Sequence, residues 1–152
     1  PALYFDNFID TYTYPADMKK WAEAGCDVNR INTPRLKVAI EYCKKNNPES
    51  DYIFVEDPFG RCRYDYRDIY NTVILLDTPI DICFDRIITR ATVRGDDKSS
   101  IDGYIQKYNE YFKDAYINTV EQVKQEADII VFADPESADL SQISDLIHDS
   151  NI

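Results

Sequence analysis

Asn71 to Gly95, NTVILLDTPIDICFDRIITRATVRG, is the stretch that decides the fold of this 152-residue chain. It begins with a short apolar run, Val73 to Leu76, that predicts a buried β-strand. Thr78 can cap a following helix, with Pro79 at the first helical position, where a missing N–H costs nothing. The apolar face of that helix consists of Ile80, Cys83, Phe84, Ile87 and Ile88. A buried strand leading directly into an amphipathic helix is typical of α/β proteins.

Three arginines, Arg86, Arg90 and Arg94, follow at four-residue spacing on a neighbouring face of the same helix. We call them the arginine row. Cations on one stripe, just past the carboxyl end of a strand, can bind phosphate oxygens. Taken alone, the row favours a solvated face that makes weak surface ion pairs.

Strand and helix patterns alternate along the rest of the chain. Strands are predicted at residues 2–5, 52–55 and 129–132, and helices at 17–24, 34–46, 100–126 and 137–148. Short, uniformly apolar strands separated by helices are typical of parallel sheets that are covered on both faces. We therefore expect one three-layer α/β/α domain over residues 1–152. Ligands of such sheets bind at the carboxyl ends of the strands.

Acidic residues stand at two of these strand ends. Asp6 follows the first strand and could accept a proton from a substrate hydroxyl, while Tyr12 and Tyr14 in the next loop could stack on a flat base. Glu56 ends the second strand and is a candidate Mg²⁺ ligand, because Mg²⁺ takes hard oxygen ligands. The adjacent Asp57 should point to the other side of that strand. Acids that merely form a turn or end a strand remain the alternative.

A second basic cluster, with Arg61, Arg63 and Arg67, lies in a tyrosine-rich segment at 60–70 that predicts a short helix. Neighbouring aspartates partly neutralise this cluster, which favours a structural or solvated role. Arg61 is nevertheless kept as a candidate substrate-binding residue.

The amino-acid composition excludes several classes of partner and compartment. The net charge of −11, from 17 basic and 28 acidic side chains, argues against nucleic acid or an anionic membrane as a partner. No apolar run approaches the ~18 residues of a membrane span, and no secretory leader is visible. The four cysteines show no CxxC spacing, so we expect a cytoplasmic protein with neither disulfides nor a cysteine metal site. The single histidine, His148, is expected at the surface.

Together these segments resemble the uridine kinase-like branch of the P-loop small-molecule kinases, over most of the chain. YFDNF (4–8) resembles the segment that holds the family's catalytic aspartate, and YIFVED (52–57) its Walker B strand. RDIYNTVILLDTP (67–79) and DRIITRATVRGDD (85–97) resemble the approach to the lid and the lid helix with its repeated arginines. DGYIQKYNEYF (102–112) resembles the long helix that follows, and ADIIVFAD (127–134) the last strand.

The resemblance implies a P-loop kinase-like fold and an ATP-dependent phosphotransferase. ATP would be the co-substrate, Mg²⁺ the cofactor, and a uridine- or cytidine-like nucleoside or a similar small molecule the acceptor. Asp6 would be the general base on the 5′-hydroxyl, and Glu56 would contact Mg²⁺ directly or through water. The arginine row would form a lid that neutralises charge in phosphoryl transfer, with Arg90 and Arg94 also binding the nucleotide. Tyr12 and Tyr14 would lie in the loop that meets the acceptor.

The chain departs from the family pattern at three points. No G-x-x-x-x-G-K-[ST] occurs in the 152 residues, so we expect an N-terminally truncated domain without its first strand, phosphate-binding loop and first helix. Asp57 stands where the family usually has glycine, and Asp96 where the lid usually has its last arginine.

Two alternative functions stay open. One is a kinase for a nucleotide or coenzyme precursor. The other is a non-catalytic, acidic α/β module that binds a nucleotide or a protein. A homo-oligomer is compatible with each of these interpretations.

Overall fold

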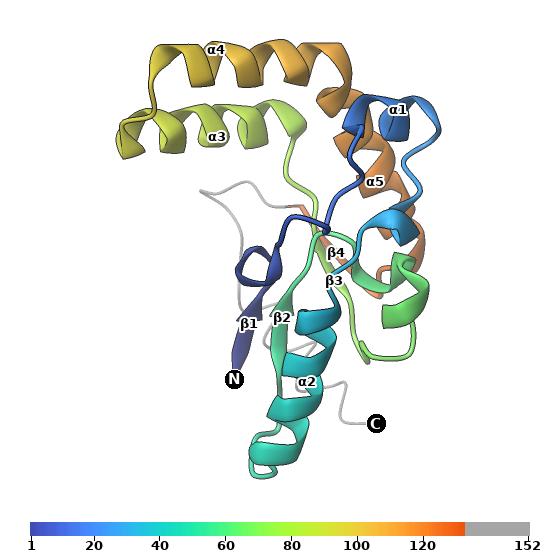
Figure 1. Ribbon diagram of the computed structural model, residues 1–152. Coiled ribbons are helices and arrows are strands. Elements are labelled where there is room, and N and C mark those ends of the chain that lie inside the picture. The colour runs from blue at the N-terminus through green and yellow to red at the C-terminus, as the bar shows by residue number, and fades with distance from the viewer. Residues whose placement is uncertain (133–152) are drawn as a thin grey trace.

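The computed structural model describes residues 1–132, in which short parallel strands alternate with helices (Figure 1). The closing helix predicted at 137–148, and His148 with it, lie outside the described residues. The helices and strands, in chain order, are β1 (Ala2–Tyr4), α1 (Met18–Glu23), α2 (Pro34–Asn46), β2 (Phe54–Glu56), β3 (Ile74–Leu76), α3 (Ile80–Arg94), α4 (Lys98–Lys107), α5 (Lys113–Glu126) and β4 (Ile129–Val131).

Short 3₁₀ turns and one π-helical turn connect these elements. The 3₁₀ turns are η1 (Phe5–Phe8), η2 (Val28–Arg30), η3 (Gly60–Cys62) and η4 (Tyr64–Tyr66), and the π-helical turn is η5 (Tyr108–Phe112). The segment at 60–70, predicted to hold one short helix, therefore contains two 3₁₀ turns. The long helix predicted at 100–126 begins earlier, at Lys98, and is divided by η5 into α4 and α5.

The α/β fold with parallel strands is confirmed. The four strands of the described region form two separate parallel pairs, β1 with β2 and β3 with β4. In the first pair Leu3 lies opposite Val55 and Tyr4 opposite Glu56, and in the second Leu75 lies opposite Ile130. Because each pair is parallel, β1 and β2 end at one shared edge, which brings the segments that follow them together.

One core joins the first half of the chain to α5. It contains the buried residues Phe5, Trp21, Cys26, Val28, Ile31, Leu36, Ile40, Phe59, Tyr66 and Ala115. The α2 helix begins at Pro34, at its predicted position, and buries Leu36 and Ile40 against this core. Trp21 of α1 donates its indole N–H to the carbonyl oxygen of Asp27, at 2.8 Å. The core therefore fixes η1, which holds Asp6, relative to the amino end of α5.

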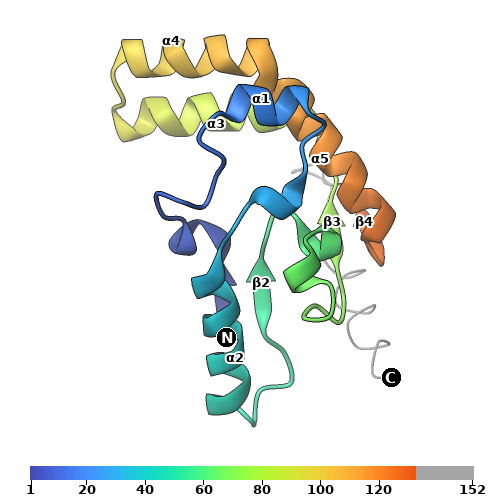
Figure 2. The same cartoon turned by 45° about the vertical axis from the view of Figure 1, so that its right-hand side comes forward.

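The helices α3 and α4 form an antiparallel hairpin that projects from the rest of the chain (Figures 1 and 2). None of the residues of α3 is fully buried, and its predicted apolar face is half-buried at most. The predicted cap is displaced by one residue: Pro79, not Thr78, is the N-cap, and its ring offers no side-chain acceptor. The helix ends at Gly95 in the left-handed region, with φ 85°, and Asp97 then caps α4 through the N–H of Ser100.

None of the helices between residues 1 and 132 combines the length and apolar character that crossing a membrane requires.

Candidate active site

The carboxylates of Asp6 and Glu56 are neighbours at the shared end of β1 and β2. The pairing of Tyr4 with Glu56 ends the two strands side by side, and the chain turns directly into η1 with Asp6. The backbone N–H of Phe5 acts on the Glu56 carboxylate and favours its charged form. Burial, and then the nearby charge of Asp6, raise the pKa of Glu56 above its ordinary value. We call this pair of carboxylates the acidic edge.

Asp6 is available to accept a proton. Its side chain is exposed, and within the described residues it has no hydrogen bond or ion pair. A carboxylate without a protein partner, placed at a strand end, is suited to act as a general base on a bound hydroxyl group.

Asp57 points away from the acidic edge into the protein, as strand alternation predicts. Its side chain is only 3% exposed and forms an ion pair with Arg63. Its two oxygens also accept hydrogen bonds from the Phe59 N–H at 3.0 Å and from the Tyr70 hydroxyl at 2.7 Å. Because these donors occupy the carboxylate, Asp57 is a structural anion.

Arg63 takes the structural role, one of the two that the sequence left open for the second basic cluster. Its side chain is only 2% exposed. The guanidinium donates to Thr33 Oγ1 at 2.7 Å and lies over the Tyr66 ring, 3.9 Å from its centroid. It also faces the rings of Phe5 and Phe59 at 5.5 and 5.3 Å. The two arginines followed closely by two tyrosines within residues 61–66 are the one sequence signal that could have suggested a buried, stacked guanidinium.

Tyr14 lies beside the acidic edge, and Tyr12 does not. The Tyr14 ring meets the edge of the Phe5 ring at 6.5 Å. Burial, and then the charge of Asp6, raise the pKa of the Tyr14 hydroxyl. Tyr12 is instead 85% exposed, and its backbone N–H donates a hydrogen bond to the Asp10 carboxylate within a turn. Of the two candidate acceptor-loop tyrosines, the structure therefore brings only Tyr14 to the site.

The arginine row runs along α3, on the projecting hairpin, with all three side chains exposed. The Arg94 guanidinium binds both oxygens of Asp96, with its Nε 2.8 Å from Oδ1. This pairing raises the pKa of Arg94 and lowers that of Asp96. Within residues 1–132 neither Arg86 nor Arg90 has an ion pair. Two of the three cations are therefore free to meet an anion.

Arg61 lies at the opposite end of the strands. Its guanidinium binds both carboxylate oxygens of Asp128, at 3.0 and 2.6 Å. It also donates to the carbonyl oxygens of Tyr70 at 2.9 Å, and of Asn71 and Glu126 at 2.5 and 3.3 Å. These residues precede β3 and β4, so Arg61 ties the amino ends of that strand pair together. The structure does not bring Arg61 to the acidic edge.

Comparison with known proteins identifies the family. A sequence model of the phosphoribulokinase/uridine kinase family matches residues 31–138, which is more than half of the chain. The chain belongs to this family. It is similar to the uridine kinase of Shewanella denitrificans, with 35% identity over 65 residues, and to that of Shewanella amazonensis, with 38% identity over 66 residues. Each match covers 43% of this chain and 30% of the relative, so the aligned stretch is less than a third of the curated proteins.

The number of protein ligands that Mg²⁺ needs is small in kinases. No group of three or more acidic, cysteine or histidine side chains that could hold a metal ion occurs within residues 1–132. Kinases of this kind do not require one, because Mg²⁺ is usually bound by one or two carboxylates together with substrate phosphates and water. A single carboxylate at the acidic edge, that of Glu56, is compatible with this mode of binding.

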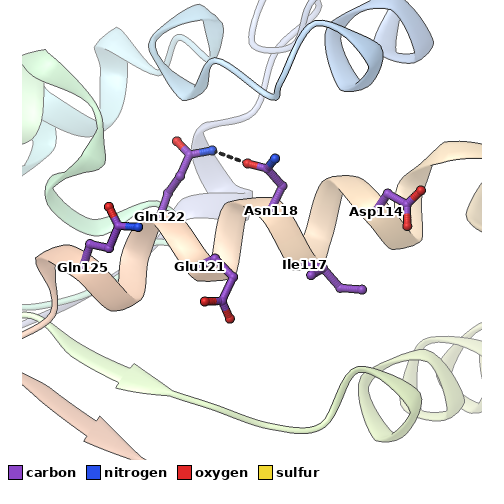
Figure 3. A pocket seen from close by; sticks show the side chains of 6 residues that line it. All are labelled: Asp114, Ile117, Asn118, Glu121, Gln122 and Gln125. Atoms are coloured by element: carbon purple, nitrogen blue, oxygen red, sulfur yellow. Dashed lines mark hydrogen bonds between the residues drawn. The ribbon is translucent and has the colours of Figure 1, made fainter.

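A shallow groove lies elsewhere on this family member, along one side of α5 (Figure 3). Its lining consists of Asp114, Ile117, Asn118, Glu121, Gln122 and Gln125. Gln122 donates to Asn118 Oδ1 at 2.7 Å and to the Cys26 carbonyl oxygen at 3.4 Å, which holds α5 against the core. The lining carries two acids and no cation, so this groove is unsuited to a phosphorylated ligand.

Proposed function

We propose that this chain forms the acceptor-binding and lid region of an ATP-dependent phosphotransferase. The reaction would transfer the γ-phosphoryl group of ATP to a hydroxyl of a nucleoside or similar small molecule. The observation that carries this proposal is the acidic edge, where Asp6 without a protein partner lies next to Glu56. Family membership supports kinase chemistry, and the similarity to two uridine kinases favours a nucleoside acceptor.

Each group has a role in this proposal. The Asp6 carboxylate accepts the proton of the attacking hydroxyl, and Glu56 holds Mg²⁺ directly or through water. When bound, Mg²⁺ would neutralise charge on the phosphate oxygens. Arg86 and Arg90, which have no ion pair in the described region, approach the phosphates when the α3–α4 hairpin closes. Arg94 joins them once it is released from Asp96.

In this proposal the phosphate cradle comes from outside these 152 residues, which contain no G-x-x-x-x-G-K-[ST]. The sheet offers a place for it. Among the described strands, β2 pairs only with β1, and β3 only with β4. Parallel strands are normally interior to a larger sheet that is covered on both faces. We therefore propose that a further strand, with a glycine-rich loop at its carboxyl end, completes the sheet.

The direct test is phosphoryl transfer from labelled ATP to a panel of uridine, cytidine, nucleoside monophosphates and coenzyme precursors. It uses the protein extended by the residues encoded upstream of Pro1, beside the 152-residue chain. We expect the extended protein to phosphorylate a nucleoside, and D6N to reduce turnover by about 10²–10⁴. D51N, which changes an exposed aspartate before β2, is the matched control.

The absence of a phosphate-loop motif favours one second candidate, a non-catalytic module that binds a nucleotide or a protein. An extended protein that binds ATP but transfers no phosphate to any acceptor would favour this alternative. Turnover by D6N at the wild-type rate would remove Asp6 from the mechanism.

A further inference from the structure

The buried side chain of Arg63 contacts a neighbour of each carboxylate of the acidic edge. Its guanidinium forms an ion pair with Asp57, which directly follows Glu56 at the end of β2. The same guanidinium lies over the ring of Phe5, 5.5 Å from its centroid, and Phe5 directly precedes Asp6. One cation therefore links the two chain segments that carry the acids.

The two neighbours of the acids are themselves packed together. Phe5 is only 1% exposed, and its ring meets the Phe59 ring at a centroid distance of 5.5 Å, with the rings nearly perpendicular. The backbone N–H of Phe59 donates to the Asp57 carboxylate at 3.0 Å, and the Arg63 guanidinium lies 5.3 Å from the Phe59 ring centroid. Close-packed groups transmit displacements. A shift of Arg63 should therefore move the segments beside both acids.

A second set of contacts joins Arg63 to the start of α2. Its Nη1 donates to the hydroxyl of Thr33, the N-cap residue of that helix, at 2.7 Å. The guanidinium lies 3.9 Å from the centroid of the Tyr66 ring, and the Tyr66 hydroxyl donates to the Thr33 carbonyl oxygen at 2.7 Å. Because the donors of a guanidinium are fixed in one plane, these contacts set its orientation. Arg63 thus relates the acidic edge to a rigid helix.

Stability alone does not account for a guanidinium at this place. The net contribution of a buried ion pair is small, because desolvation cancels much of the attraction, and apolar residues of similar volume often stabilise a fold as well or better. Arg63 Nε is also buried without a hydrogen-bond partner within the described residues, which costs further stability. The contacts beside both acids supply a different reason for the arginine.

We propose that Arg63 is a positioning residue, which holds Asp6 in the geometry relative to Glu56 that phosphoryl transfer requires. This inference rests on the proposed function, in which Asp6 accepts the proton of the attacking hydroxyl. It adds a residue that acts through Asp6 without touching the substrate. A displacement of about 1 Å can lower the rate of an enzyme about 10²-fold, so a small shift of η1 is sufficient.

The first test is a double-mutant cycle in the extended protein, measured as phosphoryl transfer from ATP to uridine. R63K retains the charge but loses the planar, stacked group and its fixed donors. We expect R63K to lower kcat about tenfold and to change the KM for uridine less than about threefold, because it displaces the base and leaves acceptor binding intact. In the D6N background, R63K should lower kcat by less than about threefold.

The cycle separates positioning from a loss of folded protein. A smaller folded fraction would reduce turnover by the same factor with and without D6N, and that result would overturn the proposal. R67K makes the same substitution at an exposed arginine and is the matched control, with turnover like that of the wild type. If R63K does not fold, T33V replaces it in the cycle, because this variant removes only the hydroxyl that accepts from Nη1.

The second test is amide hydrogen exchange of the 152-residue chain, which requires no activity. R63K should speed exchange of the amides in η1 at least about fivefold relative to the amides of the β3–β4 pair, because the region around Asp6 opens locally. Global unfolding would instead speed exchange in both regions equally. An equal change in the two regions, or no change in either, would overturn the proposal.

The two proposals fail separately. An extended protein that transfers no phosphate to any acceptor would refute the kinase function, and hydrogen exchange would still decide whether Arg63 fixes η1. Phosphoryl transfer by the wild type, together with unchanged exchange of η1 in R63K, would refute the positioning role alone.

Discussion

Asp57 and Arg63 form an ion pair whose side chains are 3% and 2% exposed, directly beneath the acidic edge. The pair distinguishes the two adjacent acids, because only Asp57 is neutralised by a buried cation. The Glu56 carboxylate lies beside that of Asp6, whereas the Asp57 carboxylate binds the Arg63 guanidinium and the Tyr70 hydroxyl. Burial, then the charge of Asp57 and the hydrogen bond to it, raise the pKa of the Tyr70 hydroxyl, so it remains a donor. By pairing with Asp57, Arg63 keeps a third carboxylate away from Asp6 and Glu56.

Removing the Arg63 guanidinium should leave the buried carboxylate of Asp57 without a positive charge beside it. We expect R63M to lower the free energy of unfolding by about 3–5 kcal/mol, the usual cost of breaking a buried ion pair on one side. Urea denaturation followed by circular dichroism measures the change. R67M, which alters an exposed arginine over the Tyr64 ring, is the control and should cost less than about 1 kcal/mol. Equal losses in the two variants would contradict a special role for the pair.

The acidic edge should make stability depend on pH. The pKa of Glu56 is raised above 4.5 in the folded chain, so protonated Glu56 stabilises the fold. That contribution is complete below the unfolded pKa and is lost as pH rises through the folded pKa. E56Q, which cannot ionise, should therefore match the wild type near pH 4 and be more stable than the wild type near pH 7.

Urea denaturation of both proteins across that pH range tests the prediction. E49Q, at an exposed glutamate before β2, is the control and should show no such pH-dependent difference. A stability difference between E56Q and the wild type that stays constant from pH 4 to pH 7 would show that ionisation of Glu56 is not its cause.

The sequence predicted the parts of the fold that local patterns determine. The cap-plus-proline opening at Thr33 and Pro34 and the Asn-Asn-Pro ending placed α2 at Pro34–Asn46, and strand alternation separated Glu56 from Asp57. The sequence could not decide between a structural and a solvated role for Arg63, because its partner Thr33 is thirty residues away in the sequence. The sequence suggested Arg61 as a substrate-binding residue for a related reason: its carboxylate partner, Asp128, lies 67 residues further along the chain. Local patterns show that a segment is basic, but long-range contacts decide where each cation points.

The members of the arginine row should differ in their contribution to nucleotide binding. Arg86 and Arg90 are free of ion pairs in the described region, whereas Arg94 is held by Asp96. We expect R90Q to weaken ATP binding about tenfold, as measured by calorimetry at low salt, and R94Q to weaken it less. D96N should release Arg94 and strengthen binding. High salt should reduce all of these differences, because exposed charges are screened. A larger loss in R94Q than in R90Q would contradict this order.

Gly60 and Gly103 should respond to alanine in opposite directions. Gly60 has φ +48°, and a Cβ there would lie 3.1 Å from Val73 Cγ1. G60A therefore combines left-handed backbone strain of about 1–2 kcal/mol with a close contact that Val73 must relieve. Gly103 lies within α4 and a Cβ there would meet no atom within 4 Å, so G103A should stabilise the chain by about 0.5–1 kcal/mol. Urea denaturation of both variants measures these changes. The chemical change is the same at both sites. Equal changes in the free energy of unfolding would therefore contradict the expected backbone strain and close contact at Gly60.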